Sequence, residues 1–578
     1  MDYFVPDWDD VVDPWYNFRE DKPSKEHLAD SSKSDVRAHQ IFPLEEVPYD
    51  GILVSRMTLA ANEAKMKRLM EAGIRRYLNL PSPLLTMADC GAWGYADRDE
   101  PPFDFAEMLE FYAKAGFDYG VSIDHMIVDT VYEENGGEWQ PRPLSMEEKR
   151  RRWEITVDNA KEMWRLADGW RTGRCPRIIG AIQGWDEESH VQAARELIET
   201  GYDYLGIGGI ARAPTSRILR IAKRISKEIQ SQGKKVERHI DLHFFGITRI
   251  DVMSDLAELG VTSFDSASLL RKAWLSKDQN YYLDERTTYS AIRIPHSERS
   301  TRVRSRMNQG RIKSDRLVEL EHEALSTLRK YARDEVGLGE TADTILRYDD
   351  AALGMRTDIQ RELRRTLRTK PWELCPCIIC KELGVDVVLH RGNDRNRRRG
   401  FHNLWVFYRH LRKKSPRILV LTNCTQRKDG AKRNLPAFLR YAKSDTFQLW
   451  WKTLYDIRGI DLAVLSAEHG LLPWWRPIQN YNRRLEELAQ DERLVLEKHV
   501  QHALARYDKV FFSGLGEYRR LMAKMSMNAP PEVELFPKSE LSKRGKLDIL
   551  ELKRQMRDLR RAVCTTLATP SRRNLDSF

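Results

Sequence analysis

The stretch RIIGAIQGWDEESHVQAARELIETGYDYLGIGGIAR, residues 177–212, decides the fold. It opens on a short apolar run, 177–183, and closes on a second one, 202–210. Between them, residues 187–200 repeat apolar side chains at the spacing of one helix face: Val191, Ala194, Leu197 and Ile198. A strand, a helix and a second strand in this order form the unit from which parallel sheets are built. The stretch therefore predicts a parallel α/β fold.

The same alternation extends along the chain from about residue 50 to residue 275. A second amphipathic helix is expected over 215–232. Further short apolar runs, each a candidate strand, lie at 51–54, 77–80, 119–127, 239–245 and 263–266. About seven or eight strand–helix units close most simply into a (β/α)8 barrel of the TIM type. The sequence therefore predicts such a barrel.

Composition divides the 578 residues into five segments. Residues 317–370 are highly charged with a helical pattern, and a new apolar strand begins at residue 416. A chain of this length is expected to hold two or three domains. We expect an N-terminal arm (1–45), the barrel (46–316), a helical insertion (317–370), a segment whose three closely spaced cysteines and one histidine predict zinc binding (371–415) and a small C-terminal α/β domain (416–578).

Charge and hydropathy restrict the classes of function. A net charge of +10, with 41% hydrophobic and 31% charged residues, fits a soluble globular protein. No apolar run has the length needed to span a bilayer. The acidic, aromatic N-terminus MDYFVPDWDDVVDPW is typical of neither a secretory signal nor a transit peptide. We therefore expect no membrane partner and a cytoplasmic location.

Basic residues concentrate in two runs, 293–316 and 391–433, and the second run contains Arg395-Asn396-Arg397-Arg398-Arg399. Local positive charge attracts polyanions. For either run alone, surface charge that only keeps the protein soluble is the simpler explanation. Two such runs near one metal-binding segment favour a nucleic-acid partner.

Three of the seven cysteines form the motif C-x-C-x2-C: Cys375, Cys377 and Cys380. His402 follows in Phe401-His402-Asn403-Leu404. Three thiolates and one imidazole are a complete tetrahedral ligand set for Zn²⁺ and leave no open position. The motif therefore predicts one structural zinc ion rather than a catalytic one.

Polar residues and glycines follow the ends of successive expected strands. In a barrel of this kind, catalytic groups lie at the C-terminal strand ends. Helix caps and turns would explain any single one of these residues, so the ordered series is the signal. The series is Asp89, Asp124, Gln183, Gly208-Gly209, Phe245-Gly246 and Asp265.

This series resembles the tRNA-guanine transglycosylases, a family in which such motifs appear in the same order before a final C-x-C-x2-C…H-N-L. The corresponding segments here are DCGAWGY, SIDH, IQGW, GGIAR, HFFG, SFDS and CPCIIC…FHNL. The resemblance covers roughly residues 50–275 and 370–412. It implies an enzyme that replaces guanine in a nucleic acid by a free 7-deazaguanine base, cleaving and remaking one glycosidic bond.

The resemblance also implies roles for single residues. Asp265 matches the nucleophile that attacks C1′, and Asp89 matches the general base that takes a proton from the incoming base. Asp124 and Gln183 match residues that hydrogen-bond the edge of the guanine-like ring. The remaining matched positions are two glycines that let the backbone approach the base, two aromatic residues that sandwich it and one arginine that contacts substrate: Gly208, Gly209, Trp93, Phe245 and Arg271.

Departures from the family favour DNA over tRNA as the substrate. Asp89 is followed by Cys90-Gly91-Ala92, where the family has a serine and two glycines, and the stretch between Asp265 and Cys375 is much longer than in the tRNA enzymes. These changes resemble the branch that installs 7-cyano-7-deazaguanine (preQ0) in DNA. Two alternatives stay open: a tRNA-guanine transglycosylase, and a non-catalytic nucleic-acid-binding subunit of a modification complex. Helper proteins of a DNA-modification system and a homodimer also stay open as partners.

The C-terminal domain has its own candidate site. The turn Cys424-Thr425-Gln426-Arg427-Lys428 follows its first expected strand, a position at which α/β sheets bind ligands. We expect nucleic-acid docking or structural support there rather than a second active site.

Overall fold

The computed structural model describes residues 1–578 except 82–83, 136–137, 170–175, 237, 248, 309–313, 355–358, 415–416, 458, 529–530, 537–548 and 569–578. Its contacts divide the chain into two compact units. The first consists of Met1–Asp7, Tyr49–Ser266 and Arg412–Phe578, and the second of Trp8–Pro48 and Ala267–Leu411. The boundary expected at 415–416 lies outside the described residues.

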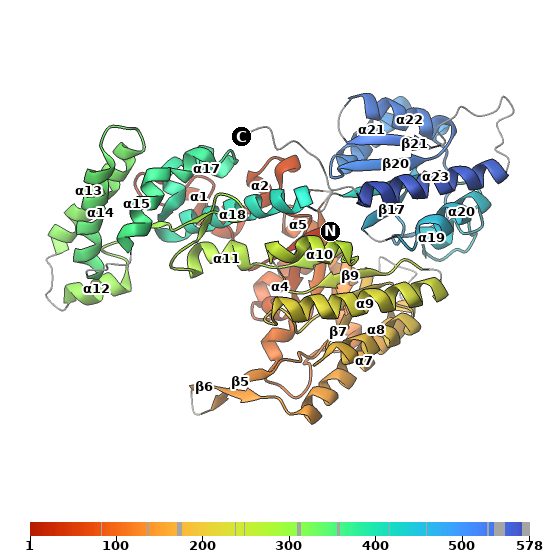
Figure 1. Ribbon diagram of the computed structural model, residues 1–578, viewed down its shortest axis with the longest axis horizontal. Coiled ribbons are helices and arrows are strands. Elements are labelled where there is room, and N and C mark those ends of the chain that lie inside the picture. The colour runs from red at the N-terminus through yellow and green to blue at the C-terminus, as the bar shows by residue number, and fades with distance from the viewer. Residues whose placement is uncertain are drawn as a thin grey trace. The chain divides into compact units, whose positions relative to one another are not determined.

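A closed barrel of parallel strands forms the centre of the first unit, in the order β1-β10-β9-β8-β7-β4-β3-β2 (Figure 1). The predicted (β/α)8 barrel is confirmed. A buried apolar cluster that includes Phe4, Met87 and Ile179 fills its interior. The strands are β1 (Asp2–Pro6), β2 (Gly51–Ser55), β3 (Leu85–Asp89), β4 (Tyr119–Val121), β7 (Arg177–Ile182), β8 (Tyr204–Ile207), β9 (Asp241–Phe244) and β10 (Ser263–Asp265).

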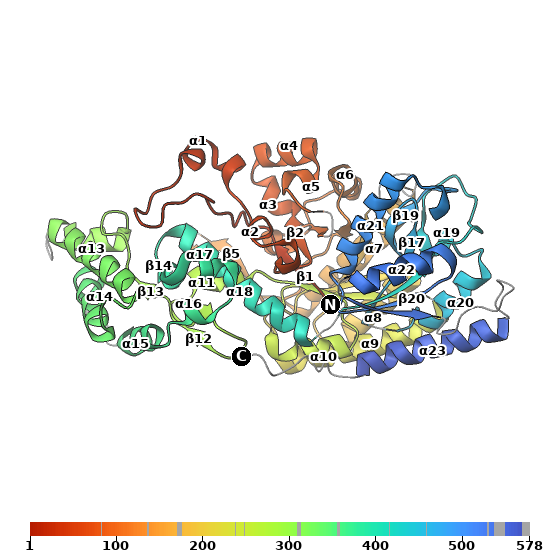
Figure 2. The same cartoon turned by 90° about the horizontal axis from the view of Figure 1, so that it is seen from above.

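Amphipathic helices surround the barrel (Figures 1 and 2). Helix α8 follows β7 and begins at Asp186, whose carboxylate accepts a hydrogen bond from the Ser189 N–H. Such a cap satisfies one of the free N–H groups of the first turn. The helices are α3 (Arg56–Ala60), α4 (Glu63–Ala72), α5 (Ile74–Tyr77), α6 (Phe105–Ala115), α7 (Met146–Gly169), α8 (Glu187–Thr200), α9 (Thr215–Val236) and α10 (Met253–Glu258).

Two expectations about the start of the barrel are wrong. Residues 1–45 are not one arm, because Asp2–Pro6 is a barrel strand that pairs with β10 on one side and β2 on the other. Its apolar core, Tyr3-Phe4-Val5, is too short to stand out among acidic neighbours. The run 77–80 is not a strand: α5 ends at Tyr77, and Asn79 adopts a left-handed backbone with φ 50°. Leu78 is fully buried, which explains an apolar residue in this turn.

A hairpin, β5 (Thr130–Asn135) and β6 (Glu138–Pro143), is inserted between β4 and α7 and projects from the barrel in Figure 1. Arg142 fixes its base through ion pairs to Glu133 at 2.5 Å and to Glu148 of α7 at 2.7 Å. Two large aromatic side chains on this hairpin, Tyr132 and Trp139, are exposed.

A second sheet in the first unit confirms the small C-terminal α/β domain. Its strand order is β18-β17-β15-β20-β21, and only β18 runs antiparallel to its neighbour. The strands are β15 (Ile418–Asn423), β17 (Ile460–Ser466), β18 (Gly470–Pro473), β20 (Lys509–Ser513) and β21 (Glu532–Phe536). The helices are α19 (Ala437–Arg440), α20 (Asp445–Leu454), α21 (Gln490–Leu504), α22 (Gly516–Asn528) and α23 (Ile549–Ala568).

This sheet covers the end of the barrel at which the strands begin. Arg417 pairs with Asp2 at 2.6 Å and with Asp50 at 2.8 Å. The Trp475 ring lies 5.0 Å from the ring of Tyr119 and packs against the apolar barrel interior. A cavity of about 610 Å³ lies between the two parts. The C-terminal domain therefore closes the end of the barrel opposite to the strand-end carboxylates.

The second unit carries the expected helical insertion and metal-binding segment. The insertion folds as α13 (Ser314–Tyr331), α14 (Leu338–Leu353) and α15 (Ile359–Thr369). The other elements are α1 (Lys25–Ser34), α2 (Ala38–Ile41), α11 (Ser268–Leu275), β11 (Tyr281–Tyr282), β12 (Thr288–Tyr289), β13 (Ile292–Arg293), α12 (Thr301–Asn308), α16 (Pro371–Leu374), α17 (Ile378–Leu383), β14 (Leu389–His390) and α18 (Gly392–Lys414).

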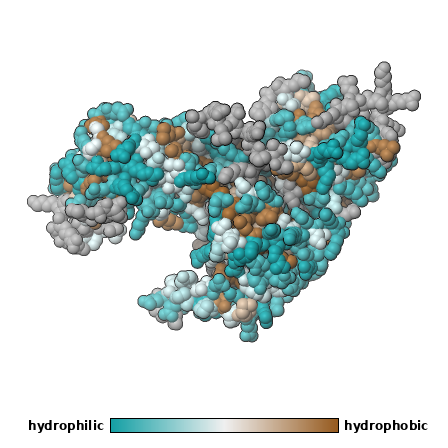
Figure 3. Space-filling model, viewed as in Figure 1, coloured by the Kyte–Doolittle hydropathy of each residue, from teal (hydrophilic) through white to brown (hydrophobic). Residues whose placement is uncertain are grey.

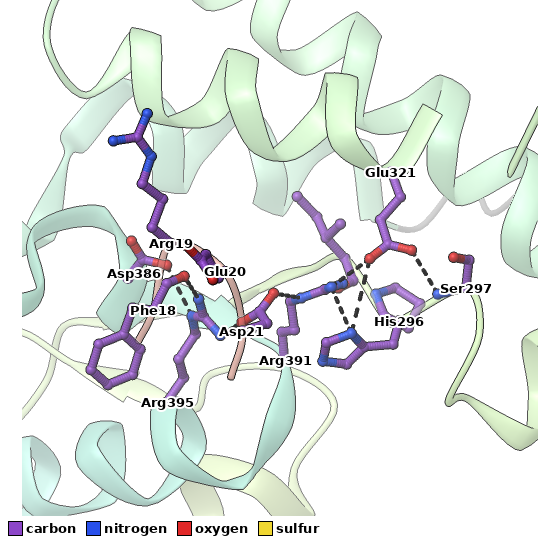
Figure 4. A network of polar contacts seen from close by, with 12 residues as sticks. Phe18, Arg19, Glu20, Asp21, His296, Ser297, Glu321, Asp386, Arg391 and Arg395 are labelled. Atoms are coloured by element: carbon purple, nitrogen blue, oxygen red, sulfur yellow. Dashed lines mark hydrogen bonds and ion pairs between the residues drawn. The ribbon is translucent and has the colours of Figure 1, made fainter. Parts of the chain in front are cut away.

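The basic run at the start of α18 is not a surface patch (Figure 4). Arg391 is buried and bonds Asp21 at 2.6 Å and Glu321. Arg395, also buried, bonds the same Asp21 and lies 2.9 Å from Asp386. Arg398 and Arg399 are buried as well and donate to backbone carbonyls. Arg391, Arg395 and Arg398 hold the segment 8–48 in place, so this part of the expected nucleic-acid patch is wrong.

The described residues on the face shown in Figure 3 are largely hydrophilic, with small apolar areas between them. Among the described helices, none is both long enough and apolar enough to cross a membrane.

Candidate active site and metal centre

The carboxyl ends of the barrel strands together form the mouth of the barrel. Asp265 ends strand β10 and is buried at this mouth. One carboxylate oxygen, Oδ1, has two donors: the Gly246 N–H at 3.0 Å and His243 Nε2 at 3.2 Å. Hydrogen bonds to an ionised carboxylate are among the stronger ones in proteins. The structure therefore fixes the orientation of this side chain.

Asp89 ends strand β3 at the same mouth, opposite Ser55 of β2 in the strand register. Its environment raises the pKa to about 8, first through burial and then through the charges of Asp265 and Asp124. Its Oδ1 atom is buried and has no hydrogen-bond partner among the described residues. A carboxyl group with this pKa is protonated at neutral pH.

Asp124 lies three residues after β4 and is buried beside Gln183. Gln183 Nε2 donates to Asp124 Oδ2 at 2.6 Å, and the Cys90 thiol donates to Oδ1 at 3.1 Å. The Tyr95 hydroxyl donates to the Asp124 backbone carbonyl at 2.7 Å. Burial raises the pKa of Asp124. The two predicted base-recognition residues are thus brought together, and Cys90 is a third member of the group.

Gly208 and Gly209, after strand β8, leave room for the Gln183 side chain. A Cβ at Gly208 would lie 2.3 Å from Gln183 Nε2. Gly209 has φ +73°, and a Cβ there would lie 2.6 Å from Gln183 Oε1. A left-handed backbone and this close approach both require glycine. The atoms that the two glycines accommodate are therefore those of Gln183, a role that the sequence alone did not indicate.

The two predicted aromatic residues lie at different depths. Trp93, on the short 3-10 helix Ala92–Tyr95, is 52% exposed, and the Arg212 guanidinium lies 5.1 Å from its ring. Phe245 packs against the apolar barrel interior, with its ring 4.4 Å from that of His243. A ligand that enters from solvent can therefore contact Trp93 directly, whereas Phe245 lies deeper, against the apolar interior of the barrel.

Arg271 belongs to the second unit. It lies on α11, where its guanidinium is 5.2 Å from the ring of Trp8. A cation over an aromatic face is a favourable contact without any ligand.

Cys375, Cys377, Cys380 and His402 form a buried group in the second unit, with all ligand atoms within 4.8 Å of one another. His402 Nδ1 lies 3.3–3.5 Å from the three sulfur atoms. In a tetrahedral zinc site, bonds of about 2.0 Å to nitrogen and about 2.3 Å to sulfur give roughly this separation. His402 Nε2 lies 2.7 Å from the Tyr282 carbonyl, which fixes the proton there and leaves Nδ1 free for a metal. The four predicted ligands could therefore hold a metal ion.

In the C-terminal domain, Cys424 follows β15 and lies 3.1 Å from the Tyr518 hydroxyl. Both residues line a cavity of about 350 Å³ together with Lys428. The docking role expected for this turn stays a prediction.

Three polar residues that contact the predicted site residues or one another were missed in the sequence: Cys90, His243 and Ser263. Cys90 directly follows Asp89, and His243 and Ser263 lie on strands β9 and β10. Their positions next to strand ends were visible, but their partners come from other strands and depend on how the barrel closes.

Comparison with known proteins agrees with this site. No protein-family profile matches the chain. The DNA-guanine transglycosylase of Salmonella montevideo is 32% identical over 421 residues, which cover 71% of this chain and 96% of that protein. This identity extends over nearly the whole length of the relative. The structure of this chain independently has the predicted barrel, its strand-end carboxylates and the Cys3His group. The chain therefore belongs to the tRNA-guanine transglycosylase family, in the branch represented by the Salmonella enzyme, and is a guanine transglycosylase.

Proposed function

We propose that this enzyme replaces guanine in DNA by a free 7-deazaguanine base such as preQ0, through a covalent bond between Asp265 and C1′. One observation carries the proposal: two carboxyl groups at one barrel mouth have different environments. Asp265 has two hydrogen-bond donors on Oδ1, whereas Asp89 has a pKa of about 8 and an Oδ1 without a partner among the described residues. Carboxyl groups held in different environments suit different steps of one reaction.

In the first displacement, a carboxylate oxygen of Asp265 attacks C1′ of the target nucleotide. The C1′–N9 bond breaks, and its electron pair stays on guanine. The protonated Asp89 carboxyl group gives its proton to the leaving base. The products of this half are a C1′–Asp265 ester, free guanine and an ionised Asp89.

In the second displacement, the ionised Asp89 takes the N9 proton of the incoming 7-deazaguanine. N9 then attacks C1′, the ester bond breaks and Asp265 is released as a carboxylate. Asp89 ends protonated, as it began, so the two halves balance. Two displacements at one carbon retain its configuration.

Base recognition is proposed for Asp124 and Gln183. A carboxylate accepts the paired N–H donors of a 2-amino-pyrimidinone edge, which adenine lacks. Hydrogen bonds from Cys90 and Gln183 already orient the Asp124 carboxylate. Trp93 and Phe245 are proposed to stack on the base, at about 1–3 kcal/mol for each base–aromatic contact.

The metal proposed for the Cys3His group is one zinc ion. All four ligand positions are protein atoms, so the ion would have no open site for substrate. Its contribution would be to fix the segment that carries Cys375–Cys380 to helix α18.

DNA is proposed as the substrate on the strength of the Salmonella relative, and tRNA is the alternative. The experiment offers purified protein isotopically labelled preQ0 with plasmid DNA and, separately, with bulk tRNA. Nucleosides are then released and separated by mass spectrometry. Label in a deoxynucleoside is the expected result. Label in tRNA alone would contradict DNA as the substrate.

The control for this experiment is Asp265→Asn. This variant should lose base exchange and still bind DNA, because the substitution removes the nucleophile and keeps the shape of the side chain. Exchange that survives in Asp265→Asn would contradict the covalent mechanism.

A further inference from the structure

A buried histidine lies behind the Asp265 carboxylate. His243 is on β9, next to β10, and its side chain is fully buried. Its Nε2 atom lies 3.2 Å from Asp265 Oδ1, and its Nδ1 atom lies 2.6 Å from Ser263 Oγ. Ser263 Oγ in turn lies 2.5 Å from the Tyr204 hydroxyl. Tyr204, Ser263 and His243 thus form a chain that ends on the proposed nucleophile.

The direction of the hydrogen bonds in this chain follows from Tyr204. Among the described residues, Ser263 Oγ is the one hydrogen-bond partner of the Tyr204 hydroxyl, so the buried phenol donates its proton there. The Ser263 hydroxyl is then free to donate to His243 Nδ1. A neutral imidazole that accepts at Nδ1 carries its proton at Nε2, which faces Asp265.

We propose that His243 is a positioning residue, which together with the Gly246 N–H reserves Asp265 Oδ1 for hydrogen bonding and leaves Oδ2 as the oxygen that attacks C1′. This inference rests on the proposed function. The two donors occupy one oxygen of the carboxylate, at 3.2 and 3.0 Å. The electron pair of the other oxygen is the one that forms the ester bond.

The same two donors also affect the balance between the two displacements. A carboxylate is a better hydrogen-bond acceptor than an ester carbonyl, because it carries the charge. His243 and the Gly246 N–H therefore stabilise free Asp265 more than the covalent intermediate. They make Asp265 a better leaving group in the second displacement, and they lower the fraction of protein that is present as the ester at equilibrium.

Two substitutions separate this role from simple packing. In His243→Gln, the amide nitrogen extends about as far as Nε2 and keeps a donor for Asp265. In His243→Asn, the shorter amide extends only as far as Nδ1, so it keeps a polar contact to Ser263 and loses the donor to Asp265. Both variants replace a buried imidazole by a smaller amide, so a packing defect alone would affect them in the same direction.

The experiment measures the covalent protein–DNA ester by mass spectrometry, with a guanine-containing oligodeoxynucleotide and a fixed concentration of free guanine. His243→Asn should increase the fraction of ester by roughly 10- to 100-fold over wild type, the range for one hydrogen bond to a charged group. Release of the ester by added preQ0 should slow by a similar factor, with the KM for DNA unchanged. His243→Gln should stay close to wild type.

Equal ester fractions and equal release rates in His243→Gln and His243→Asn would overturn the inference. The control is His190→Gln, because His190 is fully buried on α8 and bonds the Asp186 carbonyl, outside the proposed chemistry. Its ester fraction should equal that of wild type. If wild type itself forms no ester with DNA, the proposed function fails instead, and the two failures are thereby distinguished.

Discussion

The Asp89 carboxyl group, with a pKa of about 8, binds a proton in the folded protein at neutral pH. In the unfolded chain the same group ionises near pH 4. Between about pH 4 and pH 8, the folded state therefore holds one proton more than the unfolded state. Stability from this group is complete below the unfolded pKa and falls as pH rises toward the folded pKa. At the residue scale, a buried carboxyl group with a raised pKa thus destabilises the fold at neutral pH.

Asp89→Asn should remove this pH dependence, because an amide does not titrate. The slope that it removes is up to about 1.4 kcal/mol per pH unit. The free energy of unfolding of the variant relative to wild type should therefore rise from pH 5 to pH 8. Urea unfolding of both proteins at several pH values measures this difference. A difference that stays constant over this range would contradict the raised pKa.

At the element scale, helix α18 contributes both to an ion-pair network and to the Cys3His group, two features that the sequence analysis treated separately. Its first turns supply Arg395 and Arg398 to the segment 8–48, and His402 on the same helix belongs to the Cys3His group. The spacing of the cysteines and His402 predicted the metal ligands, because a ligand set is read from residue types. The run of arginines wrongly predicted a surface patch. A charge pattern does not show which arginines form ion pairs with distant carboxylates such as Asp21.

Asp21→Asn should destabilise the second unit strongly. The Asp21 carboxylate is buried and serves both Arg391 and Arg395, which also lower its pKa. Removing one charge from a buried ion-pair network costs about 3–5 kcal/mol, because the partner charges stay buried. Urea unfolding measures the loss. Asp30→Asn is the matched control, since Asp30 forms an exposed pair with Lys33 at 2.9 Å, and its loss of stability should be much smaller because an exposed ion pair contributes little. Equal losses in the two variants would contradict the account of this network.

Removing the metal should destabilise the second unit as well. The bound metal stabilises the folded state by about 4 kcal/mol when its free concentration exceeds Kd 1,000-fold. A chelator should therefore lower the free energy of unfolding, zinc should restore it, and metal analysis should find about one zinc per chain. Cys377→Ala should imitate the chelator, whereas Cys424→Ala, outside the Cys3His group, should not. A wild-type protein that is metal-free and equally stable would contradict the zinc proposal.

At the scale of the whole molecule, the alternation of apolar runs and helix patterns predicted the barrel and the C-terminal domain, but not how the barrel closes. Closure needs β1, whose residues Asp2–Pro6 carry too little pattern to be recognised alone. The covering of its far end involves Trp475 and Arg417, and it was not predicted either, because contacts between residues so distant in the sequence leave no local signal. The same limit explains why Asp89, Asp124 and Asp265 could be proposed one by one, whereas the contacts of His243 could not.

Trp475→Ala tests whether the C-terminal domain acts by closing the barrel. Loss of a large aromatic side chain from a core costs about 3–5 kcal/mol, and Trp475, which is only partly buried, should lie near the lower end. The rate of base exchange should be close to that of wild type when it is measured at a temperature at which the variant stays folded. The reason is that the mouth is at the other end of the barrel. Unfolding and exchange assays measure the two effects. Loss of exchange in a fully folded variant would contradict this division of roles.

The most direct test of the central claim is to identify the residue that bonds to DNA. The protein is mixed with a guanine-containing oligodeoxynucleotide without an incoming base, denatured, digested and mapped by mass spectrometry. The account predicts an adduct on Asp265 that added 7-deazaguanine discharges from the native complex, and none in Asp265→Asn, although that variant still binds the oligonucleotide. An adduct on another residue, or no adduct although labelled base enters DNA, would contradict it.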